Sequence, residues 1–190
     1  MSKVIEGRRD EVARARVELE DSTFVALQEW QLGTALHNAI ARLSWNNFFE
    51  AVAIRRRDKR LEVFLRKRAD NDNTYPGEWH APGAAFRPGE NERDVANRLK
   101  QEFGIPIASF HYVGEYVDWK KGEARGSGIS RIYLVELKGA PREDDRHGWY
   151  PVNKFPEVTV FHHRRRLGII PKAVRAFKAE AAKSVAHPNK

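Results

Sequence analysis

The sequence predicts a domain of mixed α and β structure, and three observations carry this prediction. Some segments alternate apolar and polar residues with a period of two, as strands do, whereas others space their apolar residues as helices do. The chain has 190 residues, of which 41% are hydrophobic and 32% charged, so it can bury a real core. It contains no cysteine, which excludes disulfides and thiolate metal sites. We expect a cytoplasmic protein without a membrane span, because no apolar run approaches about 18 residues.

The first 45 residues predict a helical N-terminal extension. Apolar residues recur there at helical spacing, with Leu36, Ala39, Ile40 and Leu43 on one face. We expect residues 1–45 to pack against the main domain or against a second copy of the chain, which would make a homodimer.

The main domain is expected to span residues 46–185, followed by a short flexible tail. Alternating apolar residues predict a β-hairpin whose turn is the polar run of residues 55–60. A polar, turn-prone segment then predicts a surface loop. The remaining expected elements are two strands and a last helix that begins at a proline. The expected ranges are 48–68 for the hairpin, 69–75 for the loop, 110–119 and 129–138 for the strands, 171–183 for the helix and 186–190 for the tail.

A central helix is predicted between Asn91 and Gly104. Asn91 can cap its first turn together with Asp94, and a glycine is the usual residue just past a helix end. At 100° per residue, the apolar side chains fall within an arc of about 100°. Glu102 lies at the margin of that arc, where a carboxylate needs a cation or a hydrogen-bond donor. That partner is either Arg98, one turn earlier, or a bound metal ion.

This region resembles the sequence motif of the Nudix hydrolases, G-x5-E-x7-R-E-U-x-E-E-x-G-U, where U is aliphatic. The matching positions are Gly83-Ala84, Glu90, Arg98, Leu99, Glu102 and Gly104-Ile105. The flanking segments WHAPG (79–83) and WYPV (149–152) are also similar to the family. The resemblance covers about residues 46–183. It implies a Nudix-like α/β/α sandwich with a mixed β-sheet, and Mg²⁺- or Mn²⁺-dependent hydrolysis of a nucleoside diphosphate linked to another moiety.

The motif departs from the family pattern at the carboxylates. It is one residue short between Glu90 and Gly104, it lacks the glutamate after the arginine, and Gln101 replaces the first glutamate of the pair. A box depleted in this way resembles the GDP-mannose mannosyl hydrolases, which implies a nucleotide-sugar substrate. That resemblance implies a metal held by Glu102, the Gly83 carbonyl and a residue of the loop at 143–148. Glu143 is the first choice, with Asp144 or Asp145 next; His147 or Asp144 would activate water.

Substrate contacts are predicted from basic and aromatic residues. Arg66 and Arg87 can grip a diphosphate through charge-assisted hydrogen bonds, and Arg87 is the better placed because it lies within the motif. Lys67 and Arg68 share the same strand end. Trp79, Tyr116 or Trp119 can stack on a nucleobase, or can serve only packing.

A second function is compatible with the same residues: a catalytically silent Nudix-like module that binds a nucleotide or RNA, or that is a subunit of a larger assembly. The loss of two carboxylates fits relaxed catalytic demand. The net charge of +8 suits an anionic partner. The run HHRRR at 162–166 is either a solvated charged edge or a contact for nucleic-acid phosphates.

Overall fold

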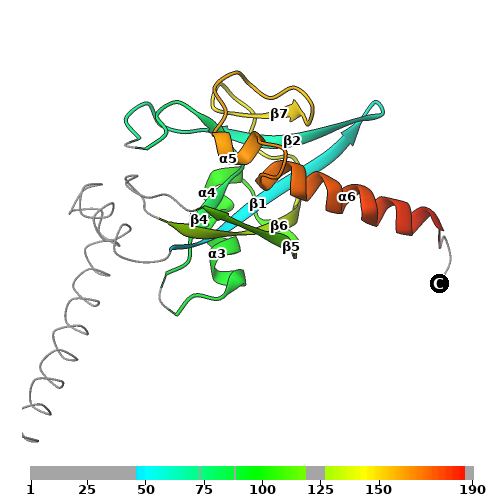
Figure 1. Cartoon of the computed structure of the whole chain (residues 1–190), viewed down its shortest axis with the longest axis horizontal. Coiled ribbons are helices and arrows are strands. Elements are labelled where there is room, and N and C mark those ends of the chain that lie inside the picture. Colours follow the sequence, from blue (N-terminus) through cyan, green and yellow to red (C-terminus); the bar gives the residue numbers. More distant parts are fainter. Residues whose placement is uncertain (1–45, 73, 88, 119–126, 187–190) are drawn as a thin grey trace, which may run out of the picture.

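A computed structural model describes residues 46–72, 74–87, 89–118 and 127–186 (Figure 1). The predicted N-terminal extension, Trp119 and the last four residues lie outside this part of the chain. Among the described residues, no helix combines the length and apolarity needed to cross a membrane.

The described strands form one mixed sheet, as the sequence predicts. Its central path runs β3-β2-β1-β6-β5, with β4 paired to β1 and β7 paired to β2. Only β1 and β6 run parallel; the other pairs are antiparallel. The strands are β1 (Asn46–Arg57), β2 (Arg60–Lys67), β3 (Trp79–His80), β4 (Gly83–Ala85), β5 (Ile107–Asp118), β6 (Gly128–Leu137) and β7 (His147–Pro151).

The predicted hairpin is confirmed as β1 and β2, but its turn is tighter than expected. Only Asp58 and Lys59 form the turn, and both have positive φ angles, of 46° and 66°. Two such residues make the twisted turn that suits a two-residue hairpin. The flanking arginines therefore belong to the strands. The sequence analysis also predicted no strand at β7, where Trp149 and its neighbours pair with β2.

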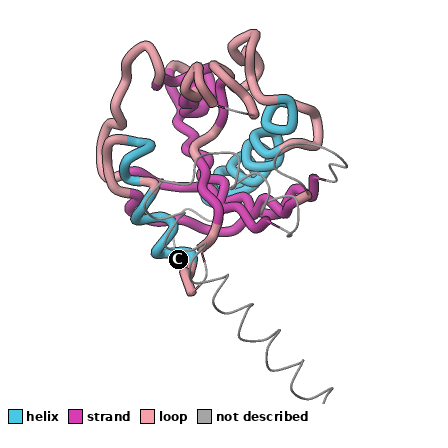
Figure 2. Tube along the Cα trace, turned by 90° about the vertical axis from the view of Figure 1, so that its left-hand side faces the viewer, coloured by secondary structure: helices cyan, strands magenta, loops and turns pink. Residues whose placement is uncertain are grey.

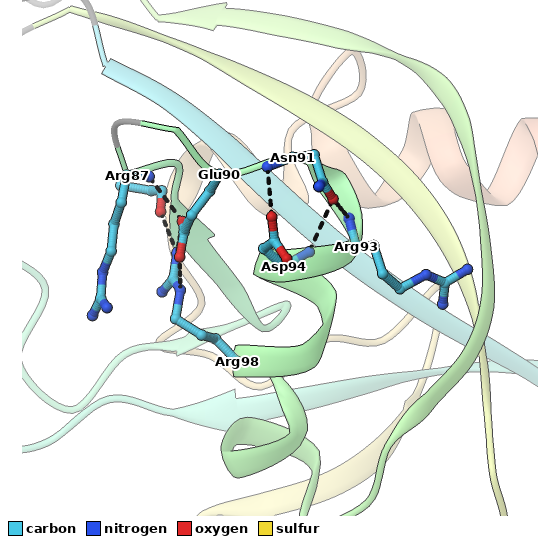
Figure 3. A network of polar contacts seen from close by, with 7 residues as sticks. Arg87, Glu90, Asn91, Arg93, Asp94 and Arg98 are labelled. Atoms are coloured by element: carbon cyan, nitrogen blue, oxygen red, sulfur yellow. Dashed lines mark hydrogen bonds and ion pairs between the residues drawn. The ribbon is translucent and has the colours of Figure 1, made fainter.

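The central helix is confirmed, although Leu99 divides it into α3 (Glu92–Arg98) and α4 (Lys100–Phe103). The Asn91 side chain accepts hydrogen bonds from the backbone N–H groups of residues 93 and 94, and Asp94 accepts one from the backbone of Asn91 (Figure 3). Gly104 ends α4 with a φ of 74°, a left-handed conformation that glycine adopts without strain. The cap residues predicted from the sequence are thus the ones used.

Two apolar clusters cover opposite faces of the sheet and make the sandwich. Phe49, Ala51 and Ala53 point to the face covered by α3 and α4, whereas Val52 between them points to the face covered by α6. Figure 2 shows helical segments on both sides of the strands. The last helix, α6 (Ile169–Ala186), begins two residues before the predicted start, and the short α5 (Phe161–Arg164) precedes it.

Candidate active site

Gly83 lies where two strands approach too closely for a side chain. It is opposite Glu50 of β1, and a Cβ at this position would lie 2.5 Å from the Glu50 Oε2 atom. The Ala51 N–H donates to the Pro82 carbonyl in the neighbouring pair, at 2.8 Å. Because bonded and non-bonded pairs alternate between antiparallel strands, the Gly83 carbonyl points away from β1. β1 therefore does not use this carbonyl as a hydrogen-bond acceptor.

The loop glutamate and the helix arginine of the motif hold each other. The Arg98 Nε and Nη2 atoms donate to the two oxygens of Glu90, each at 2.7 Å, and Nη2 also donates to the Ala85 carbonyl at 2.7 Å. The Arg87 N–H donates to Glu90 Oε2 at 2.9 Å (Figure 3). Burial raises the pKa of Glu90, but the hydrogen bonds from Arg98 and Arg87 outweigh it and lower that pKa below its usual value. This pair fixes the motif loop to α3.

Glu102 pairs with a residue that the sequence analysis did not connect to it. Its Oε2 accepts a hydrogen bond from Arg66 Nη1, and both side chains are partly buried. Arg98, one of the two partners that the sequence analysis left open for Glu102, donates instead to Glu90 and to a backbone carbonyl. The partner of Glu102 comes instead from β2, which lies far from it in the sequence.

The acidic residues of the loop before β7 contact arginines and a histidine. Glu143 lies 3.6 Å from the guanidinium of Arg55. Asp144 lies 2.7 Å from His147 Nδ1 and also pairs with Arg142. The hydrogen bond with His147 lowers the pKa of Asp144 to about 2. The contacts of Glu143 and Asp144 therefore do not include Glu102.

The arrangement does not fit a Nudix metal centre built from several carboxylates. Within the described ranges, no group of three histidine, aspartate or glutamate side chains could hold a metal ion. Gln101, which replaces the first glutamate of the pair, is exposed, and the glutamate that follows the arginine in the family pattern is absent. The remaining glutamate is already neutralised by a guanidinium. A Mg²⁺ ion prefers several oxygen ligands in octahedral geometry, which one paired carboxylate cannot supply.

Cations gather at the end of β2 instead. Arg66 and Arg68 both lie near His80, whose pKa is lowered by burial and then by these two charges. Arg68 donates to Asp72 at 2.7 Å, yet its buried Nε has no hydrogen-bond partner among the described residues. In Figure 3 the Arg87 side chain extends away from Glu90. A guanidinium without a full set of acceptors favours an anionic ligand.

The two described aromatic candidates make packing contacts. The Trp79 ring meets the Tyr150 ring edge-on, with centroids 4.9 Å apart. Tyr116 is only 9% exposed, and its ring stacks on His162 at 5.9 Å and lies 5.7 Å from the guanidinium of Arg165. Because Tyr116 is buried, stacking of its ring on a nucleobase would require its neighbours to move.

A buried polar cluster beside Gly83 was missed in the sequence analysis. Glu50 accepts a hydrogen bond from Ser130 at 3.1 Å and lies 3.9 Å from His163 Nε2. His163 Nδ1 in turn accepts the Ala81 N–H at 3.3 Å. The available signal was a glutamate inside an otherwise apolar strand, since a charge at such a position must find partners.

Comparisons with known proteins agree with this architecture. The NUDIX domain family model matches residues 48–168, more than half of the chain. The NUDIX domain of Shewanella oneidensis NrtR, complexed with ADP ribose, is similar in structure, with a TM-score of 0.56 and 19% identity over 70% of this chain and 89% of that one. A mutT/nudix family protein from Listeria innocua is also similar, with a TM-score of 0.54 and 22% identity over 72% of this chain and 96% of that one. The MutT NUDIX hydrolase from Burkholderia pseudomallei has a TM-score of 0.51 and 24% identity over 62% of this chain and 92% of that one.

No curated protein sequence matches the chain. At these identities the solved structures establish the fold, and the family model establishes the membership. The chain belongs to the NUDIX domain family.

Proposed function

We propose that this Nudix domain binds a nucleoside diphosphate compound through guanidinium groups and not across a cluster of metal-bound carboxylates. The observation that carries the proposal is the pairing of Glu102, the last glutamate of the motif, with Arg66. The motif helix therefore presents a neutral ion pair where a hydrolase of this family would present metal ligands.

The charges around this pair support an anionic ligand. Arg66 can exchange the Glu102 carboxylate for a phosphate oxygen, and the positive charge of Arg68 acts on the same neighbouring histidine, His80. Arg87 extends from the motif loop (Figure 3). Guanidinium groups bind phosphate through paired, charge-assisted hydrogen bonds. The NrtR domain that is similar in structure is complexed with ADP ribose, a compound of this class.

A second candidate is hydrolysis of the same class of compound, for example a nucleotide sugar, with Mg²⁺ or Mn²⁺. The outward direction of the Gly83 carbonyl and the retention of Glu102 favour it. It requires Arg66 to release Glu102. It also requires Glu143 to leave Arg55, and Asp144 or His147 to leave the contact that joins them.

Calorimetric titration with ADP-ribose and with GDP-mannose, in EDTA and in Mg²⁺, separates the two candidates. We expect both compounds to bind in EDTA, because guanidinium groups and not a metal ion hold the diphosphate. Adding Mg²⁺ should change the affinity less than about threefold, which corresponds to less than about 1 kcal/mol. Arg66→Ala should weaken binding about tenfold, the loss of one charge-assisted contact. Glu102→Gln should strengthen binding, because it removes the carboxylate that competes for Arg66.

Glu157→Gln, a loss of the same charge at an exposed position, is the matched control and should leave affinity unchanged. Product assays on the same samples complete the test. Metal-dependent turnover that disappears in Glu102→Gln would establish the second candidate. Failure of both compounds to bind in either condition would refute the proposal.

A further inference from the structure

The end of α5, the turn after it and the start of α6 present cations that form no ion pair with an acidic side chain of the described residues. Arg165 Nη1 donates to the Tyr116 hydroxyl at 3.2 Å, Lys172 Nζ donates to the Glu115 carbonyl, and Arg175 Nη1 donates to the Arg166 carbonyl at 3.2 Å. These acceptors are neutral, so the three charges are not cancelled. Arg164 and Arg166 are exposed and form no ion pair within the described residues.

An exposed aromatic ring lies beside one of these cations. Phe161 is 62% exposed, and its ring is 5.5 Å from the Arg165 guanidinium, which lies 5.7 Å from the Tyr116 ring on another side. Large apolar side chains at the surface mark interaction sites when they cluster with specific polar groups. We call this surface the basic platform; its residues are Phe161, Arg164, Arg165, Arg166, Lys172 and Arg175.

Buried contacts of α5 and of the turn after it fix the position of the basic platform. His163 is only 3% exposed and accepts the Ala81 N–H, which ties α5 to the segment between β3 and β4. Gly168 closes the turn so tightly that a Cβ there would lie 2.3 Å from the His162 carbonyl oxygen. A surface that is already ordered loses little conformational entropy on binding.

We propose that the basic platform binds a single-stranded polynucleotide. Its clustered positive charges match a phosphate backbone, and the exposed ring of Phe161 offers a face on which an unpaired base can stack. The net charge of +8 steers such a polyanion toward the protein. The residues of the basic platform differ from those of the nucleotide site around Arg66, and neither proposal depends on the other.

Fluorescence anisotropy with a labelled single-stranded oligonucleotide of about 20 nucleotides tests this proposal, since one folded module covers about 4 to 16. We expect Arg164→Glu/Arg166→Glu to weaken binding at least about tenfold. The slope of log affinity against log salt should fall by about 1.4, because each lost phosphate contact contributes about 0.7 for single strands. Phe161→Ala should weaken binding about fivefold or more, the loss of one stacked base.

The matched control is Arg57→Glu/Arg60→Glu, which changes the same charge at the exposed tip of the β1–β2 hairpin. It should change affinity less than about threefold, because it alters only the long-range field. Thermal melting checks that each variant folds, and Arg164→Gln/Arg166→Gln replaces the charge reversal if that variant does not. Equal losses at the two surfaces would overturn the proposal. So would equal binding of a duplex with no effect of Phe161→Ala, or binding only to phosphatidylserine vesicles.

Discussion

At the residue scale, the partners of two motif residues were decided by the quality of hydrogen bonding. A helical pair between Arg98 and Glu102 would contribute only about 0.3 to 0.5 kcal/mol at an exposed site. Glu90 instead offers Arg98 two oxygens in a planar arrangement, and the Ala85 carbonyl offers a third acceptor. Guanidinium groups favour such bidentate geometry. Because Arg98 pairs with Glu90, Glu102 pairs with Arg66, and this second ion pair lies at the candidate site.

Replacing Arg98 with lysine tests this explanation. The ammonium keeps the charge but cannot donate in a fork to Glu90, so we expect a loss of about 1 to 3 kcal/mol in the free energy of unfolding. Urea unfolding measures it. Because the pKa of Glu90 is lowered in the folded state, its contribution exists above the ordinary value of 4.5 and is lost as pH falls below that value. A loss that is the same at pH 7 and at pH 3 would contradict the assigned role.

At the element scale, buried histidines join α5 to β3. The His80 and His163 rings lie 5.9 Å apart, and both side chains are almost fully buried. Burial lowers the pKa of each well below the usual 6.5. Neighbouring positive charges lower both pKa values further: Arg68 acts on both rings, and Arg66 acts on His80. The folded protein therefore keeps both rings neutral where the unfolded chain would take up protons.

Stability should consequently fall as pH drops below about 6.5. Each histidine that binds a proton only in the unfolded state contributes a slope of about 1.4 kcal/mol per pH unit. Urea unfolding between pH 7 and pH 5 measures the total slope. His80→Gln should reduce this slope by about 1.4 kcal/mol per pH unit, the contribution of one proton. An equal change in His111→Gln, at the exposed surface of β5, would contradict the assignment.

At the scale of the whole molecule, the family match and both apolar clusters lie within the described residues from 46 onward. Among the described residues, helices on both sides of one sheet bury these clusters. We infer that the residues from 46 onward can fold as one unit, because a domain carries its own hydrophobic core.

Removing residues 1–45 should therefore leave a folded domain. We expect a cooperative thermal transition within about 5 °C of the full chain, the shift that about 1 kcal/mol produces in a domain of this size. Binding of ADP-ribose should persist. Loss of the transition on truncation would show that the N-terminal residues complete the core.

The sequence by itself determined the elements whose signals are local. The hairpin, the capped helix from Asn91 and its glycine end follow from alternation, capping chemistry and backbone freedom within a few residues. Alternation failed for β7, because the tryptophan there pairs with a distant strand and its segment follows a polar loop. The motif positions could be found in the same way, because their spacing is fixed along the chain.

Only the tertiary structure decided what surrounds those positions. Three of the pairs join residues that are far apart in the sequence: Glu102 with Arg66, Glu143 with Arg55, and Glu50 with His163. A charged side chain takes the partner that the packed elements bring near it, since leaving it buried alone costs several kcal/mol. The character of the site therefore depends on which strand ends meet α4, and the spacing of the motif does not contain that information.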